Sequence, residues 1–193
     1  RNFCGNELPD GMRKNEKLPE PIITPSTKAA KGNHDESVPP SELYKRGVVD
    51  PALYKELARI SMRLYERGVA RAADHGMIFV DTKYEFGISN GKIMLMDEVN
   101  TPDSSRYWMA DDYEKRFENN EEPRKLDKEY VRTWLADQGF KGDGKPPKLT
   151  DKLRVEAASR YMEVVENFTG EPMQLEVGPV DESIYSILNP FAY

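Results

Sequence analysis

The chain has 193 residues, of which 38% are hydrophobic, so it can bury one sizeable core and its length favours a single domain, or a domain with appendages. Acidic residues outnumber basic ones by 34 to 28, and the Lys and Arg residues are scattered among acids, so we expect no nucleic-acid partner. A single cysteine, Cys4, excludes an internal disulfide framework, and no apolar run approaches the roughly 20 residues that span a bilayer. We therefore expect a cytoplasmic protein without a membrane partner.

Residues 1–50 are rich in Pro and Gly and show little periodicity. The prolines of residues 18–25 favour extended backbone, because a residue before proline avoids the helical region. We predict a loop with one edge strand around Ile22 and Ile23, although the composition also allows a disordered linker. The chain starts without an initiator Met or a recognisable domain start, which suggests a fragment of a longer protein.

The clearest helix signal covers residues 51–74. Asp50 is a good N-cap, and Pro51 suits the first helical position. Gly76 is well placed to end the helix. Between these signals, apolar residues recur at helical spacing, namely Leu53, Leu57, Ile60 and Leu64.

Residues 77–99 have the pattern of a β-hairpin. The segment 77–87 starts apolar and then alternates charged and aromatic residues, which is typical of a strand. Residues 89–91, with the sequence Ser-Asn-Gly, are a turn signal, and residues 92–99 supply the second strand. Residues 101–106 are then predicted to be a loop.

Two more helices are predicted downstream. The first covers about residues 127–138, where Asp127 can act as the N-cap. The second covers residues 151–169, where Thr150 can act as the N-cap and Gly170 as the terminator. Helix, hairpin and helices in this order predict an α+β fold, an antiparallel sheet with packed helices.

Alternate residues of a strand share a face, so Asp81, Lys83 and Glu85 are expected to point the same way. Whether Asp97 joins them depends on the length of the turn. A two-residue turn would pair Tyr84 with Asp97 and leave that charge among aromatic residues, which is unfavourable.

A three-residue turn with Gly91 in the left-handed conformation would instead pair Lys83 with Asp97. We favour this register because it separates polar from apolar side chains on both strands. Three carboxylates beside one lysine would repel one another and call for a cation, and oxygen ligands suit Mg²⁺. The alternative is a solvated sheet face with surface ion pairs, and the residues alone leave both possibilities open.

Two long segments resemble the signature segments of the SAICAR synthetase family: VDTKYEFG at residues 80–87 and DEVNTPDSSRYW at residues 97–108. Three other segments are similar to the same family, at residues 18–28, 34–36 and 126–135. The resemblance covers roughly residues 5–170. Two specific motifs in the expected order make it a strong signal.

The resemblance implies an ATP-dependent ligase of purine biosynthesis. Members of the family join the carboxylate of carboxyaminoimidazole ribotide to the amine of L-aspartate through an acyl phosphate. The chain would form the larger lobe of a two-lobed, ATP-grasp-like fold. The Gly-rich phosphate loop of the other, amino-terminal lobe is absent from this sequence, so we expect that lobe as a partner and expect these residues alone to be inactive.

The resemblance also implies roles for individual residues. Glu85 and Asp97 match Mg²⁺ ligands, and Glu85 would also bind the nucleotide. Lys83 matches a lysine near the reacting groups. Asp81 would be catalytic, or would only orient Lys83 or Arg106.

The remaining implied residues bind substrates. Lys28 would lie near the ribose of the nucleotide, and Asp35 in the substrate-binding part of the same site. The loop that holds the ribotide would consist of Asp103, Ser104, Ser105 and Arg106.

We expect three regions: an extended segment, residues 1–50, that completes the lobe; residues 51–170, which carry the site; and a carboxy-terminal tail, residues 171–193. One competing hypothesis is a pseudoenzyme or interaction module that binds a nucleotide or ribotide without turnover. Another is an acidic scaffolding domain whose hairpin is stabilised by a cation.

Overall fold

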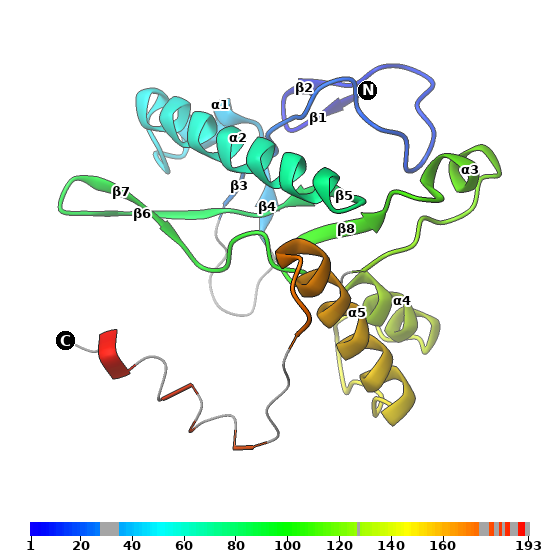
Figure 1. Cartoon of the computed structure of the whole chain (residues 1–193). Helices are drawn as coiled ribbons and strands as arrows, with labels where there is room; N and C mark the ends of the chain where they lie inside the picture. Colours follow the sequence, from blue (N-terminus) through cyan, green and yellow to red (C-terminus); the bar gives the residue numbers. More distant parts are fainter. Residues whose placement is uncertain are drawn as a thin grey trace.

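Figure 1 shows the computed structural model, which describes residues 1–27, 35–126, 128–173, 178–179, 182, 184–185 and 189–191. The fold is α+β, as predicted, with helices packed around antiparallel strands. The expected single sheet is wrong for the described residues, because each of their four ladders joins only two strands. None of the helices in this part of the chain combines the length and apolar character needed to cross a bilayer.

Helix α2, Pro51–Asp74, has the bounds predicted from the sequence. The Asp50 carboxylate accepts hydrogen bonds from the backbone N–H groups of Ala52 and Leu53, both at 2.9 Å, which satisfies two of the unpaired donors of the first turn. Gly76 follows the helix at φ +68°, a conformation that glycine adopts without strain.

The core lies between α2, the strand pair β5–β8 and helix α5. Strand β5, Met77–Thr82, pairs antiparallel with β8, Ser105–Met109. In the view of Figure 1, α2 lies above this pair and α5, Asp151–Thr169, lies below it. The fully buried ring of Tyr107 contacts the Phe79 ring at a centroid distance of 5.0 Å. The other buried members of this cluster are Ala72, Met77, Leu126 and Val164.

The two downstream helices are confirmed. Helix α5 begins after Thr150, whose hydroxyl accepts the N–H of Leu153 at 3.2 Å, and ends at Gly170 with φ +78°. Helix α4, Glu129–Asp137, is shorter than the predicted 127–138. The predicted cap Asp127 lies outside the described residues.

The predicted hairpin register is wrong. Strands β6, Glu85–Ser89, and β7, Lys92–Met96, pair Ser89 with Lys92, so the turn contains two residues. Asn90 and Gly91 both have positive φ, 51° and 73°, as a type I′ turn requires, and this turn matches the twist of the strands. Positive φ at Gly91 is confirmed, but Lys83 is not the strand partner of Asp97.

The expected penalty of this register does not arise, because the ladder ends at Glu85 and Met96. Asp97 has φ 63° and turns the chain out of the strand. The predicted first strand is also two strands, since β5 pairs with β8 instead of joining the hairpin. Consequently Ser105 and Arg106, predicted as loop, belong to β8.

The amino-terminal region contains more structure than its composition indicated. Ile22 and Ile23 belong to no strand, so that prediction is wrong. The carbonyl of Ile23 instead accepts a hydrogen bond from the Asn6 side chain at 2.8 Å. The elements of this region are β1 (Asn2–Phe3), β2 (Asn6–Glu7), β3 (Ser26–Thr27), β4 (Glu36–Ser37) and α1 (Pro40–Lys45). Further along the chain, α3 (Tyr113–Glu118) and the 3-10 turn Asn189–Phe191 were also not predicted.

Candidate active site

A polar hollow of about 290 Å³ lies where the end of β5, the start of β8 and the start of α4 meet. It brings together all four residues of the expected ribotide loop and adds Asp81 and three residues of the α4 region. The lining residues are Asp81, Asp103, Ser104, Ser105, Arg106, Lys128, Glu129 and Arg132.

Asp81 and Arg106 form a two-pronged ion pair across the β5–β8 ladder, in which they are direct partners. The Arg106 Nε–H donates to both Asp81 carboxylate oxygens, at 2.8 and 3.0 Å, and Nη2 donates to Oδ2. The side chains are 47% and 48% exposed, so the pair adds little stability but fixes the plane of the guanidinium. Of the two partners considered for Asp81, the structure selects Arg106 and not Lys83.

Hydroxyl groups continue the polar surface of the hollow. The buried Ser105 Oγ lies 2.9 Å from the hydroxyl of Thr82 and 3.3 Å from that of Ser104. Thr101 stabilises this loop with two hydrogen bonds. Its Oγ1 accepts the Ser104 N–H at 3.2 Å, and its carbonyl accepts the Ser105 N–H at 2.9 Å. The more exposed Ser104 is the better placed of the two serines to meet a ligand.

Lys128, Glu129 and Arg132 are site candidates that the sequence analysis missed. Lys128 Nζ lies 3.7 Å from Asp103 Oδ1, and Arg132 forms an ion pair with Glu129 within the helix. Their spacing along the chain shows that residues 128, 129 and 132 share a helix face. It does not show that this face borders Arg106, since that depends on the packing of α4.

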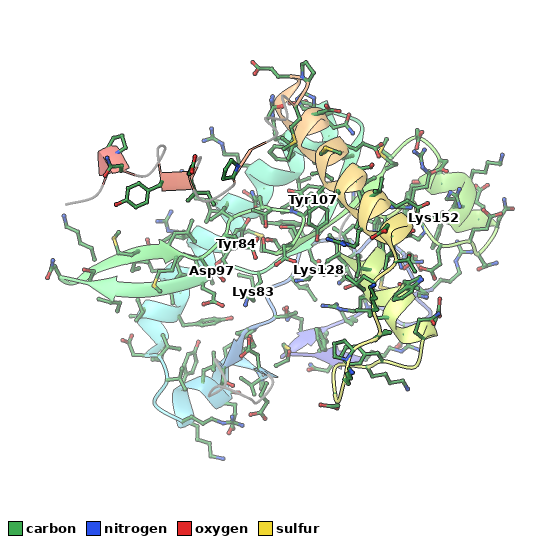
Figure 2. The ribbon with its side chains drawn as sticks, turned by 90° about the horizontal axis from the view of Figure 1, so that it is seen from below. Lys83, Tyr84, Asp97, Tyr107, Lys128 and Lys152 are labelled. Atoms are coloured by element: carbon green, nitrogen blue, oxygen red, sulfur yellow. The ribbon has the colours of Figure 1, made fainter. Side chains whose placement is uncertain are left out.

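A second charged cluster surrounds Lys83, whose Nζ donates to Glu85 Oε1 at 2.7 Å. This hydrogen bond is the main reason that the pKa of Lys83 is raised. Partial burial lowers the pKa, and the negative charges of Glu85, Asp35 and Asp97 raise it further. Figure 2 shows Lys83 and Asp97 beside each other. Lys83 therefore stays cationic at neutral pH, with three carboxylates acting on it.

The proximity of Lys83 and Asp97 was expected, but its cause is different. The strands do not pair these residues; Asp97 lies just beyond the end of the ladder, with a left-handed backbone, and its charge acts on Lys83 from there. Asp81, in contrast, lies in the hollow with Arg106, so the expected cluster of three carboxylates on one strand face is not formed. Within the described residues, no group of three or more His, Cys, Asp or Glu side chains is arranged to hold a metal ion.

The two clusters are neighbours. The backbone N–H of Lys83 donates to the carbonyl of Ser104 at 3.2 Å, which joins the segment between β5 and β6 to the rim of the hollow. Lys28, expected at the nucleotide ribose, lies outside the described residues. The site therefore has an acidic part around Lys83 and a part rich in Arg, Lys and hydroxyl groups around Arg106.

Comparison with known proteins gives one consistent result. The family model described as SAICAR synthetase matches residues 2–149. Among curated relatives named phosphoribosylaminoimidazole-succinocarboxamide synthase, the protein of Bacteroides thetaiotaomicron is 51% identical over 89% of this chain and 55% of its own length. The protein of Flavobacterium psychrophilum is 42% identical over 95% of this chain and 60% of its own length.

Solved structures agree with these relatives. SAICAR synthase from Saccharomyces cerevisiae in complex with SAICAR has a TM-score of 0.71 at 30% identity, and the match covers 90% of this chain and 55% of that chain. A type-2 SAICAR synthetase in complex with ADP has a TM-score of 0.62 at 28% identity, and the match covers 85% of this chain and 57% of that one. The chain thus spans little more than half the length of the proteins that it matches.

Proposed function

Because the chain belongs to the SAICAR synthetase family, we propose that it forms the larger lobe of an ATP-dependent ligase of purine biosynthesis. The ligase joins carboxyaminoimidazole ribotide to L-aspartate. The observation that carries the proposal is the hollow itself, where Arg106, Lys128 and Arg132 line one space together with the serines of the family-like segment 97–108. A cytoplasmic enzyme of small metabolites fits the acidic composition and the single cysteine.

The hollow binds the ribotide in this proposal. Arg106, held flat by Asp81, presents a planar donor group suited to a phosphate or carboxylate, and Ser104 adds a hydroxyl. Lys128 and Arg132 supply two more positive charges. Each of these cations is held by an acid in a partly exposed ion pair, so an anionic ligand can add to the arrangement or compete with the acid without a large loss of stability. Asp81 acts through Arg106 as a positioning residue.

In this proposal the Lys83 cluster lies beside the transferring phosphoryl group and stabilises its charge. Three carboxylates that act on one ammonium make this part of the site rich in oxygen ligands and negative overall, which fits a hard cation. We assign Glu85 and Asp97 to Mg²⁺, because this ion usually takes one or two protein carboxylates and completes its shell with water and phosphate oxygens. When bound with ATP, the ion neutralises charge on the transferring phosphoryl. Lys83 offsets the remaining negative charge.

The reaction proceeds in two steps. The ribotide carboxylate attacks the terminal phosphorus of ATP, and a P–O bond breaks to give ADP and an acyl phosphate. The amine of L-aspartate then attacks the acyl carbon, phosphate leaves with the C–O bond electrons, and the amine nitrogen loses a proton. The hydrogen bond between Lys83 and Ser104 supports this assignment, because it keeps the carboxylate-binding and phosphoryl-binding parts adjacent.

The missing partner is the amino-terminal lobe of the same enzyme. The 193 residues contain no Gly-rich phosphate loop and span about 55% of the relatives' length, so the groups that grip ATP come from elsewhere. These residues alone are therefore inactive as a ligase. An assay with ATP, L-aspartate and the ribotide tests this, and turnover within about tenfold of a full-length relative would refute it.

Ribotide binding separates this proposal from an unrelated scaffolding role. We would titrate carboxyaminoimidazole ribotide into the chain by calorimetry and compare Arg106→Gln with Arg124→Gln. Arg124 is a matched control, since it pairs with Asp111 at 43% and 59% exposure and does not line the hollow. Losing a charged hydrogen bond worth about 1.5–3 kcal/mol should weaken binding at least about tenfold in the first variant only. Equal affinities in the two variants would refute the hollow as the ribotide site.

The same titration addresses a second candidate function, a binding module without turnover. The residues that line the hollow all lie within this chain, so we expect the ribotide to bind without the missing lobe. Joining the chain to the amino-terminal lobe of a full-length relative then decides between the two functions. Ligase turnover supports the enzyme, whereas ribotide binding without turnover in the joined protein supports the module.

A further inference from the structure

Asn100 lies midway along the loop that connects the two parts of the site. It follows Asp97 by three residues and precedes Asp103 by three. Its backbone is left-handed, with φ 57°, a conformation that asparagine tolerates better than most residues. The chain therefore has a left-handed residue at Asn100, between Asp97 and Asp103, in addition to the one at Asp97.

Two tyrosine hydroxyls donate to Asn100, one from each part of the site. The Tyr84 hydroxyl donates to the side-chain oxygen of Asn100 at 2.8 Å, and Tyr84 stands between Lys83 and Glu85 in the chain. The Tyr107 hydroxyl donates to the main-chain carbonyl of Asn100 at 2.5 Å, and Tyr107 follows Arg106. Figure 2 shows Tyr84 and Tyr107 extending from separate parts of the ribbon.

The half-buried Asn100 also lies close to helix α2. A Cβ atom added to Gly68 of α2 would lie 3.0 Å from the side-chain Nδ2 of Asn100, so the helix and the loop are in close contact. Tyr107 is fully buried. Burial raises the pKa of the Tyr84 hydroxyl to about 12 and that of Tyr107 as well, so both stay protonated donors at neutral pH.

We propose that Asn100 is a positioning residue that holds the segment 83–85 and strand β8, which carries Arg106, in one fixed relation. The loop thereby presents Asp97 to Lys83 and Asp103 to the hollow. Asn100, Tyr84 and Tyr107 do not line the hollow as the structure describes it, so they act through the residues that they hold. As a statement about ligand binding, the inference rests on the proposed function; as a statement about geometry, it can be tested without any ligand.

The ligand-free test is amide hydrogen exchange in Tyr84→Phe, which removes one donor and leaves the loop sequence unchanged. The Lys83 N–H, bonded to Ser104, and the Ser105 N–H, bonded to Thr101, report on the two parts of the site. The Ala110 N–H, bonded to the Gly76 carbonyl at 2.9 Å, reports on the same ladder region away from the loop. We expect the first two to exchange at least about tenfold faster and Ala110 to change less than about twofold.

Equal acceleration of all three amides would mean that Tyr84 only stabilises the fold, and no acceleration would mean that the contact is dispensable. Either result overturns the proposal. A second pair of variants tests the acceptor directly. Asn100→Asp keeps an oxygen acceptor and tolerates a left-handed backbone, so exchange should stay within about threefold of the wild type. Asn100→Leu has no side-chain acceptor and disfavours a left-handed backbone, so its amides should exchange as fast as those of Tyr84→Phe. If Asn100→Leu does not fold, the exchange rates of Tyr84→Phe still test the proposal.

The binding test uses carboxyaminoimidazole ribotide with the 193-residue chain. Tyr84→Phe should weaken binding about five- to tenfold, with the Arg124→Gln affinity as the reference. Local acceleration of exchange with unchanged ribotide affinity would overturn the positioning role. If the unmodified chain binds no ribotide, the proposed function fails, and the exchange pattern still decides whether Asn100 joins the two parts.

Discussion

Gly68 offers a direct test of the packing beneath the site. It is the buried glycine of α2, and an added Cβ would lie 2.7 Å from Phe79 Cε1, 3.0 Å from Phe79 Cδ1 and 3.0 Å from the Asn100 amide nitrogen. The Phe79 ring cannot move aside easily, because it stacks on Tyr65 at 5.3 Å and contacts Tyr107 at 5.0 Å. The substitution Gly68→Ala therefore forces a core ring or the loop at Asn100 to shift.

Two opposing terms set the size of the effect. Replacing glycine by alanine within a helix stabilises the folded state by about 0.5–1 kcal/mol. Overpacking of a dense core costs about 1–3 kcal/mol. The second term should win, so we expect Gly68→Ala to lower the free energy of unfolding by roughly 1–2 kcal/mol. For a chain of this size, each kcal/mol corresponds to about 2–4 °C in the melting temperature.

Urea unfolding followed by circular dichroism measures this difference. Ala70→Gly is the matched control, since Ala70 is exposed two residues further along the same helix and its replacement isolates the helix-propensity term. The control should lose about 0.5–1 kcal/mol. If Gly68→Ala were instead more stable than the wild type, by about the amount that Ala70→Gly loses, the close approach of α2 to Phe79 and Asn100 would be refuted.

Two further predictions concern charge. Without metal, Glu85→Gln should lower the melting temperature slightly, because Lys83 loses its ion-pair partner, whereas Asp97→Asn, at an exposed position, should leave it unchanged. Mg²⁺ and ATP should then raise the melting temperature less in both variants than in the wild type. A rise equal to that of the wild type would contradict the metal assignment. Burial raises the pKa of the Tyr84 hydroxyl to about 12, above the ordinary value of about 10. The contribution of the protonated hydroxyl to the free energy of unfolding is therefore complete below about pH 10 and is lost as the pH rises to about 12. Urea unfolding across that range should show stability falling with pH, less steeply in Tyr84→Phe, and equal slopes would show that Tyr84 does not contribute.

Helix bounds could be predicted because their signals are local. Asp50 and Gly76 flank α2, and Thr150 and Gly170 flank α5, and each cap depends on a few adjacent backbone groups. That residues 103–106 lie together could also be predicted, because 97–108 is one continuous motif. They lie together in the hollow because they are consecutive in the chain: Asp103 and Ser104 belong to the turn that precedes β8, and Ser105 and Arg106 begin the strand.

The hairpin register could not be predicted from side-chain sorting. The sorting assumed that the ladder continued to Asp97, and under that assumption a two-residue turn buried a charge. The chain avoids this cost through one left-handed residue, Asp97, after Met96. The left-handed backbone at Asp97 therefore removes the energy difference between the two registers that the alternation of residues indicated.

The sequence by itself determined the family, the long helices with their caps, and which residues lie on one motif, because each of these depends on neighbours along the chain. Only the tertiary structure decided which partner each charged residue has. Asp81 pairs with Arg106 across a strand pair that the sequence did not reveal, and α4 brings Lys128 and Arg132 to the same hollow. The physical reason is that ion pairs between distant segments add little stability of their own, so they follow the packing of the core around Phe79 and Tyr107.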